Sequence, residues 1–271
     1  MNVKKERLCD LFCENFGFSQ PAGAQKHEMF KIGSFDVMEG SAEEGGTYSS
    51  VFTGNLWEKE SALIKECAEA LTGVIVRHAS ALCTKKPEKV LVAALGNPFV
   101  AADSLGTRCA EKITATGGSA ELICLGYPEV YVIKTGVRAQ SGLHSSELIS
   151  LVSRRVKAEL VFAIDSLAAR SPARLSTVIQ VSDAGITPGS GASSHALAVD
   201  KQSVGCPVIT LGVPTVIRAA QDDFKASLCI PEKEDKTPSL YTFANIDSVI
   251  SCYSSVLASA LNSFFSGYCH K

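Results

Sequence analysis

The chain lacks an excess of charge of either sign. Its 271 residues include 26 basic and 28 acidic side chains, which gives a formal net charge of -2, and no block of like charges occurs. Proteins that bind nucleic acid through bulk electrostatics carry a basic surplus, so direct binding of nucleic acid is not expected. We also find no apolar run of signal-peptide length at the start and no run of about 18 uncharged apolar residues elsewhere. The chain is therefore expected to be cytoplasmic, without a membrane partner.

Paired cysteines are missing too, although the chain has 10 cysteines. No CxxC pair occurs, and no histidine lies at zinc-finger distance from a pair of cysteines. Several cysteines lie in apolar segments, such as Cys124 in ELICLG and Cys206 in GCPVITLG. We expect buried free thiols in a reducing compartment, with no metal site and no cofactor.

Two common signatures of active sites are absent as well. The small-residue loop TPGSGASS (187–194) is not followed by Gly-Lys-Ser or Gly-Lys-Thr, so it is not a nucleotide-binding P-loop. No GxSxG elbow occurs, and His144 and His195 both lie in loops rich in serine and glycine, which does not favour a histidine-based triad. Glycine allows a ligand to approach the backbone closely, so Gly189 and Ser190 are candidates for shaping a binding site.

What the chain does contain is an alternation of strand-like and helix-like segments. Short apolar runs rich in Val, Ile and Leu predict buried strands at 90–95, 160–164 and 208–211. Helical patterns cover 56–82, 103–115, 145–157 and 245–268. This alternation predicts an α/β protein, a three-layer sandwich around a mainly parallel sheet. Residues 1–55 contain glycines and short β-like pieces, and we expect a lead-in there before an α/β domain over 56–271.

Two aspartates stand where the first two predicted strands end. Asp103 lies in LGNPFVAADSLGTR (95–108), and Asp165 lies in VFAIDSLAARS (161–171). Taken alone, each is explained as the N-cap of a following helix, because aspartate is a favoured cap. The carboxyl ends of parallel strands share one edge of a sheet, so the two carboxylates could instead converge. Converging carboxylates can share a proton, with one acting as a base toward water and the other as an acid.

Three further polar residues are candidates for supporting roles. Asn97 turns the chain after the first strand, and we expect it to help shape the site. Arg170 follows Asp165 by five residues and could pair with an acid or hold a substrate carboxylate or carbonyl. Asp183 follows a possible strand at 178–181, and we interpret it as a turn or hydrogen-bonding residue rather than a catalytic one.

Taken together, these stretches resemble one protein family. FAIDSLAARSPARLSTVIQVSDAGITPGSGASS (162–194) and GCPVITLGVPTVI (205–217) closely resemble the germination protease family of endospore-forming bacteria. VLVAALGNPFVAADSLGTR (90–108) resembles the first acidic motif of that family. Good correspondence covers about residues 88–220, and weaker similarity extends over 45–87 and 240–265.

The resemblance implies an α/β fold shared with hydrogenase-maturation proteases and an atypical aspartic-type endopeptidase. The two essential aspartates of the family match Asp103 and Asp165 in this sequence. It also implies small acid-soluble spore proteins as substrates, a tetrameric zymogen, and a location in the forespore or spore core. The first 40 residues depart from the family pattern, because they lack the acidic self-cleavage motif of the propeptide.

Two other hypotheses stay open at this point. The chain could be a spore protein that binds peptides through the same site without cleaving them, or with a different specificity. It could also be a metal-sensing protease of the hydrogenase-maturation type that uses the acids to recognise a metal.

Overall fold

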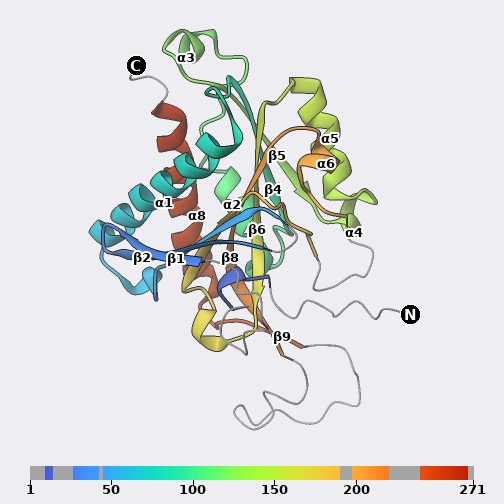
Figure 1. The fold of residues 1–271 in the computed structure, drawn as a ribbon. Helices are drawn as coiled ribbons and strands as arrows, with labels where there is room; N and C mark the ends of the chain where they lie inside the picture. Colours follow the sequence, from blue (N-terminus) through green and yellow to red (C-terminus); the bar gives the residue numbers. More distant parts are fainter. Residues whose placement is uncertain (1–9, 15–26, 43–44, 190–196, 220–238, 268–271) are drawn as a thin grey trace.

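The computed structural model describes residues 10–14, 27–42, 45–189, 197–219 and 239–267 (Figure 1). Their strands form one nine-stranded sheet with the order β1-β2-β3-β7-β8-β6-β4-β5, and β9 pairs with β8. The strands are β1 (His27–Ile32), β2 (Phe35–Ser41), β3 (Thr47–Phe52), β4 (Lys89–Leu95), β5 (Glu129–Gly136), β6 (Leu160–Ala169), β7 (Val178–Ser182), β8 (Val208–Ala219) and β9 (Ser239–Tyr241).

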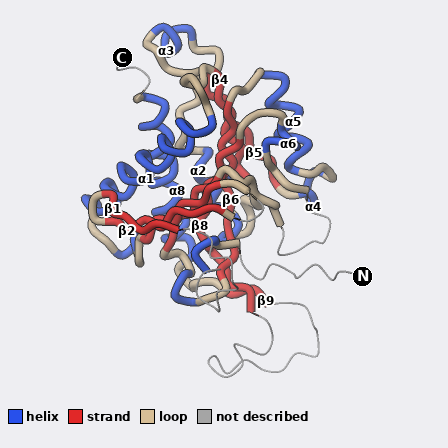
Figure 2. The backbone as a smooth tube through the Cα atoms, viewed as in Figure 1, coloured by secondary structure: helices blue, strands red, loops and turns tan. Residues whose placement is uncertain are grey.

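The sheet is mixed, so the expectation of a mainly parallel sheet is wrong. Strands β5, β4, β6 and β8 run parallel to one another. The hairpin strands β1 to β3 join them through an antiparallel pairing of β3 with β7, and β7 and β9 are also antiparallel to β8. Residues 27–52, which were expected to precede the main domain, therefore extend the same sheet. Figure 2 shows β1 and β2 running across the direction of β4 and β5, as the twist of a large sheet requires.

Helices cover both faces of the parallel strands. Figure 1 shows α1 and α8 on one side of β4 and β6, and α5 and α6 on the other. The described α-helices are α1 (Ser61–Leu82), α2 (Leu105–Ala110), α3 (Ala120–Cys124), α4 (Arg138–Ser141), α5 (Ser145–Val156), α6 (Lys201–Val204) and α8 (Ile246–Ser266). Val92 and Phe162 pack into the larger core under α1 and α8, while Leu91 and Val161 pack into a second core under α5. Because both faces are buried, the predicted apolar runs are continuous rather than alternating.

Helix α8 is the one described helix that is long and apolar enough to cross a membrane. Inside this fold, 61% of its most apolar stretch is buried. Its buried side chains include Tyr253, Leu257 and Phe265, and they belong to the larger core beside α1. The helix is thus as apolar as its packing in the core requires.

Neither aspartate is a helix cap, which corrects that part of the sequence interpretation. Asp165 lies inside β6, because β8 pairs with β6 along its length from Val161 to Ala169. Asp103 ends a short 3-10 helix, and the N-cap position of α2 belongs to Ser104.

Candidate active site

The loop after β4 carries Asp103 and is fixed by Asn97. The backbone N–H of Asn97 donates to Oδ2 of Asp103 at 2.8 Å. Its side-chain Oδ1 accepts from the backbone N–H of Phe99 and from Nε2 of Gln140, both at 3.0 Å. Gly96 turns the chain with φ 93°, and a Cβ there would collide with the backbone of Asp103. Asn97 therefore holds both the shape of the loop and the Asp103 carboxyl group.

Two further contacts hold the loop after β4 close to the central strands. Oγ1 of Thr215, on β8, donates to the carbonyl of Ala102 at 2.6 Å. Gly106, in the first turn of helix α2, lies so close to the sheet that a Cβ there would be 2.5 Å from the carbonyl oxygens of both Leu95 and Ile164. This close approach sets the position of Asp103 relative to β6.

Asp165 is the most deeply buried carboxyl group of the site, with 6% of its surface exposed. The backbone N–H of Ser166 donates to its Oδ1 at 2.9 Å. Burial raises the pKa of Asp165 well above its ordinary value, and the negative charges of Asp103 and Asp10 raise it further, while the Ser166 bond opposes them. Asp165 therefore favours its protonated form.

Asp103 is half-buried, and its environment differs from that of Asp165. Burial raises the pKa of Asp103, and the hydrogen bond from the Asn97 amide lowers it. The negative charge of Asp103 is the second cause, after burial, of the raised pKa of Asp165, so the two carboxyl groups influence each other. Two interacting carboxyl groups with unequal burial can hold one proton between them.

An N-terminal segment that sequence reasoning missed lies beside this pair. The backbone N–H of Asp10 donates to the carbonyl of Ala168 at 3.0 Å, and the N–H of Ala168 donates to Oδ2 of Asp10 at 2.9 Å. Glu14 accepts from the backbone N–H groups of Arg170 and Ser171 at 2.7 and 2.8 Å. Nothing in the local sequence DLFCE indicates a partner strand more than 150 residues away.

The other candidate residues lie apart from the two acids. Arg170 is exposed at the end of β6. The chain from Asp165 to Arg170 is extended and spans roughly 16 Å, so no helix directly follows Asp165. Asp183 accepts from the N–H of Thr47 and closes the pairing of β3 with β7, as a hydrogen-bonding residue would. Gly189 is exposed with φ 68°, and Ser190 lies outside the described residues.

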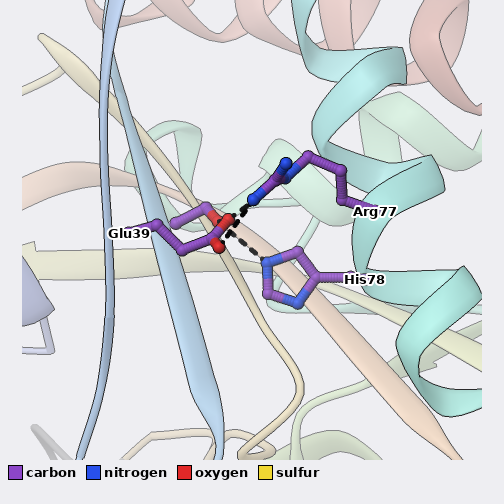
Figure 3. Close-up of polar contacts among 4 residues, drawn as sticks. Glu39, Arg77 and His78 are labelled. Carbon is purple, nitrogen blue, oxygen red and sulfur yellow. Dashed lines mark hydrogen bonds and ion pairs between the residues drawn. The ribbon is translucent and has the colours of Figure 1, made fainter. Parts of the chain in front are cut away.

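A second polar cluster connects the hairpin strands to α1 (Figure 3). Oγ of Ser49 lies 2.9 Å from Nε2 of His78 and donates to Oε2 of Glu39 at 3.1 Å, while Arg77 pairs with Glu39 at 2.8 Å. Serine here lies between histidine and carboxylate, whereas a catalytic triad needs histidine in the middle. Ser49 is also fully buried. The cluster therefore has the geometry of a structural tie and not of a nucleophile.

Burial is the main influence on the pKa of the histidine in this cluster. It lowers the pKa of His78, while the charges of Asp183 and Glu39 raise it and that of Arg77 lowers it. Within the described ranges, no group of three His, Cys, Asp or Glu residues could hold a metal ion. The seven described cysteines are free thiols: Cys13, Cys67, Cys83, Cys109, Cys124, Cys206 and Cys252.

The fold and the site define a mixed α/β protein with one carboxyl group inside a central parallel strand and a second in the loop that follows the neighbouring strand. The family whose sequence model matches residues 22–223 is described as germination protease. This match covers most of the chain, and the chain belongs to the germination protease family.

Individual relatives agree with this assignment. The chain is 38% identical over 178 residues to the germination protease of Caldanaerobacter subterraneus subsp. tengcongensis, covering 64% of this chain and 54% of the relative. It is 34% identical over 205 residues to that of Bacillus subtilis, covering 71% and 55%. The chain thus spans about half the length of the curated relatives it matches.

One solved structure is similar as well. A NiFe hydrogenase maturation protease from Thermococcus kodakarensis matches with a TM-score of 0.39 and 16% identity, covering 69% of this chain and 98% of that one.

Proposed function

We propose that this protein is an endopeptidase in which Asp103 and Asp165 together activate water against a peptide bond. The observation that carries the proposal is the electrostatic interaction of the half-buried Asp103 with the buried Asp165, each within a motif that resembles the family's essential aspartates. A pair of acids with different environments is the arrangement that general acid–base catalysis of hydrolysis needs.

The unequal environments suggest the role of each acid. Asp103, which accepts a hydrogen bond from the Asn97 backbone N–H, is ionised. It takes a proton from water as the water oxygen attacks the carbonyl carbon of the scissile peptide bond. Asp165, the more buried of the two, carries a proton and donates it to the carbonyl oxygen. When the C–N bond breaks, the amine leaves with the proton that Asp103 received, and the proton on the former carbonyl oxygen returns to Asp165. Both acids then regain their starting states.

The substrates that we propose are small acid-soluble spore proteins, and the support for them is the family resemblance. The same resemblance supports a homotetramer, processing from a zymogen, and a cytoplasmic location in the forespore or spore core. The absence of a metal or cofactor from the reaction is likewise part of the proposal.

The proposal is tested by incubating the purified full chain with a small acid-soluble spore protein and identifying the products by mass spectrometry. We expect cleavage by the wild type and a loss of at least 100-fold in rate for Asp103→Asn and for Asp165→Asn. Asp36→Asn is the matched control, because Asp36 is an exposed acid on β2 that pairs with Lys31. Wild-type rates in either site variant would contradict the proposed pair.

Two other outcomes identify the alternative hypotheses. Binding of the spore protein without any product after long incubation would favour a non-catalytic peptide-binding protein. Cleavage that stops on strong chelation and returns with an added divalent metal would favour a metal-sensing protease.

A further inference from the structure

On the side of β6 that faces β4, the pairing of the described strands ends directly before Asp165. β4 pairs with β6 only from Leu160 to Ile164, whereas β8 covers the opposite edge as far as Ala169. Among the described strands, none pairs with the β4 side of β6 beyond Ile164. An unpaired edge of this kind presents a row of backbone groups that can pair with another extended chain.

The backbone N–H groups along this edge donate hydrogen bonds to carboxylates and not to a neighbouring strand. The N–H groups of Ser166, Ala168 and Arg170 donate to carboxylates of Asp165, Asp10 and Glu14 respectively. Alternate residues of an extended chain direct their amides to the same edge, so these three donors form one row. The row starts beside the candidate catalytic acid and leads away from it.

Asp10 shows that this edge accepts a main-chain hydrogen bond from another segment. Its backbone N–H donates to the carbonyl of Ala168, and residues 12–14 after it form a short 3-10 helix rather than a strand. Leu11, the next residue, is fully buried in an apolar cluster with Leu167, Ala169 and Val178. A main chain on the edge and an apolar side chain on the adjoining face are thus both accommodated within a few residues of Asp165.

From this geometry we propose that the β6 edge from Ser166 to Arg170 is the substrate-docking edge. An extended peptide pairs with these amides as an added strand, and one of its apolar side chains takes the place of Leu11. This inference rests on the proposed endopeptidase function and adds to it the manner of substrate binding. Backbone pairing fixes the register of the peptide, so that its scissile bond is presented to Asp165 and Asp103.

The peptide and residues 10–14 use the same amides and therefore exclude each other. Glu14 holds the far end of the segment through the N–H groups of Arg170 and Ser171. Loss of the Glu14 carboxylate weakens this hold without touching either acid of the pair. Binding of an external peptide is then favoured.

Backbone pairing has a signature that recognition of side chains alone does not share. Only alternate residues of an added strand bond to the edge. We would use a spore-protein peptide spanning the cleavage site and methylate its backbone nitrogens one at a time. Methylation at every second position is expected to raise KM by roughly 2- to 10-fold, the loss of one hydrogen bond, and to leave KM unchanged at the positions between. Equal effects at neighbouring positions would overturn the proposal.

The same peptide series separates failure of docking from failure of the proposed function. If the wild type does not cleave the unmethylated peptide, the proposed activity fails, and Kd values from fluorescence anisotropy take the place of KM. An alternating pattern in Kd would then still support the docking edge, and a uniform pattern would refute it.

A variant pair tests the competition. Glu14→Ala is expected to lower KM, or Kd, for the unmethylated peptide at least twofold. Glu28→Ala, which removes an exposed carboxylate on β1 at the far end of the sheet, is expected to leave it unchanged. An unchanged value for Glu14→Ala would contradict the proposal, because the segment and the peptide cannot share one set of amides.

Discussion

The close approach of α2 to the sheet makes Gly106→Ala a sharp test of how Asp103 is positioned. An added Cβ would lie 2.5 Å from the carbonyl oxygens of Ile164 and Leu95 and 2.8 Å from the Leu95 nitrogen. All three atoms belong to the backbone of central strands, so neither a rotamer change nor a small side-chain shift relieves the contact. Overpacking of this kind costs about 1–3 kcal/mol.

A cost of this size is measurable in the melting temperature and in the rate. For a chain of this length it lowers Tm by roughly 2–12 °C. Helix α2 must move outward, and Asp103 lies three residues before Gly106 in the same turn of chain. A displacement of about 1 Å in a catalytic group can lower kcat by about 100-fold.

Gly73→Ala is the matched control, because Gly73 lies inside α1 and its added Cβ meets only Ile32 Cδ1 at 4.0 Å. Alanine in a helix interior is favoured over glycine by about 0.5–1 kcal/mol, so this variant is expected to gain stability and keep its activity. Thermal unfolding and peptide cleavage are measured on both variants, and we expect lower Tm and lower kcat for Gly106→Ala alone. Equal stability and equal activity in the two variants would refute the claim that α2 sets the position of Asp103.

Three further predictions concern stability. Because the folded pKa of Asp165 is raised, its protonated form stabilises the fold at low pH, and this contribution is lost as pH rises from the ordinary pKa toward the folded pKa. The free energy of unfolding of Asp165→Asn relative to wild type should therefore increase with pH, by at most about 1.4 kcal/mol per pH unit in urea unfolding. Burial lowers the pKa of His78, so acidification through its ordinary pKa should destabilise the wild type, and His78→Gln should flatten that dependence in urea unfolding. Tyr253→Phe should cost about 1–3 kcal/mol in urea unfolding, because the buried hydroxyl donates to the Ser176 carbonyl and lies 2.6 Å from Thr53 Oγ1. A pH-independent difference for Asp165→Asn, an unchanged slope for His78→Gln, or a neutral Tyr253→Phe would each contradict the corresponding argument.

Local sequence patterns predicted the elements that local physics determines. The run Val90–Leu95 became β4, and the periodic segment 145–157 became α5, because continuous burial and helical periodicity are visible in the residues themselves. The long helix predicted over 56–82 is α1, which begins later, at Ser61, after a 3-10 turn.

Features that depend on distant partners were missed or wrongly predicted. The length of β6 follows from its pairing with β8, which is not visible in the local sequence. The local pattern alone favours the start of a helix for the four residues after Asp165. The mixed sheet follows from the pairing of β3 with β7, which joins segments more than 120 residues apart. The contact of Asp10 with Ala168 could not be predicted for the same reason, because the pattern of side chains in a segment does not show which distant strand it will contact. The pairing of Asp103 with Asp165 stays a prediction; it is argued from strand ends that share an edge, whereas Asp165 lies within its strand.

Direct activation of water by Asp103 and Asp165 can be measured by single-turnover cleavage in ¹⁸O-labelled water. We expect one ¹⁸O atom in the new carboxyl terminus in the first turnover of the wild type, and no product in the same time from Asp103→Asn. A first-turnover product without ¹⁸O would show attack by an enzyme group, and full activity of Asp103→Asn would show that this acid is not the base. Either result would overturn the proposed roles of the two acids.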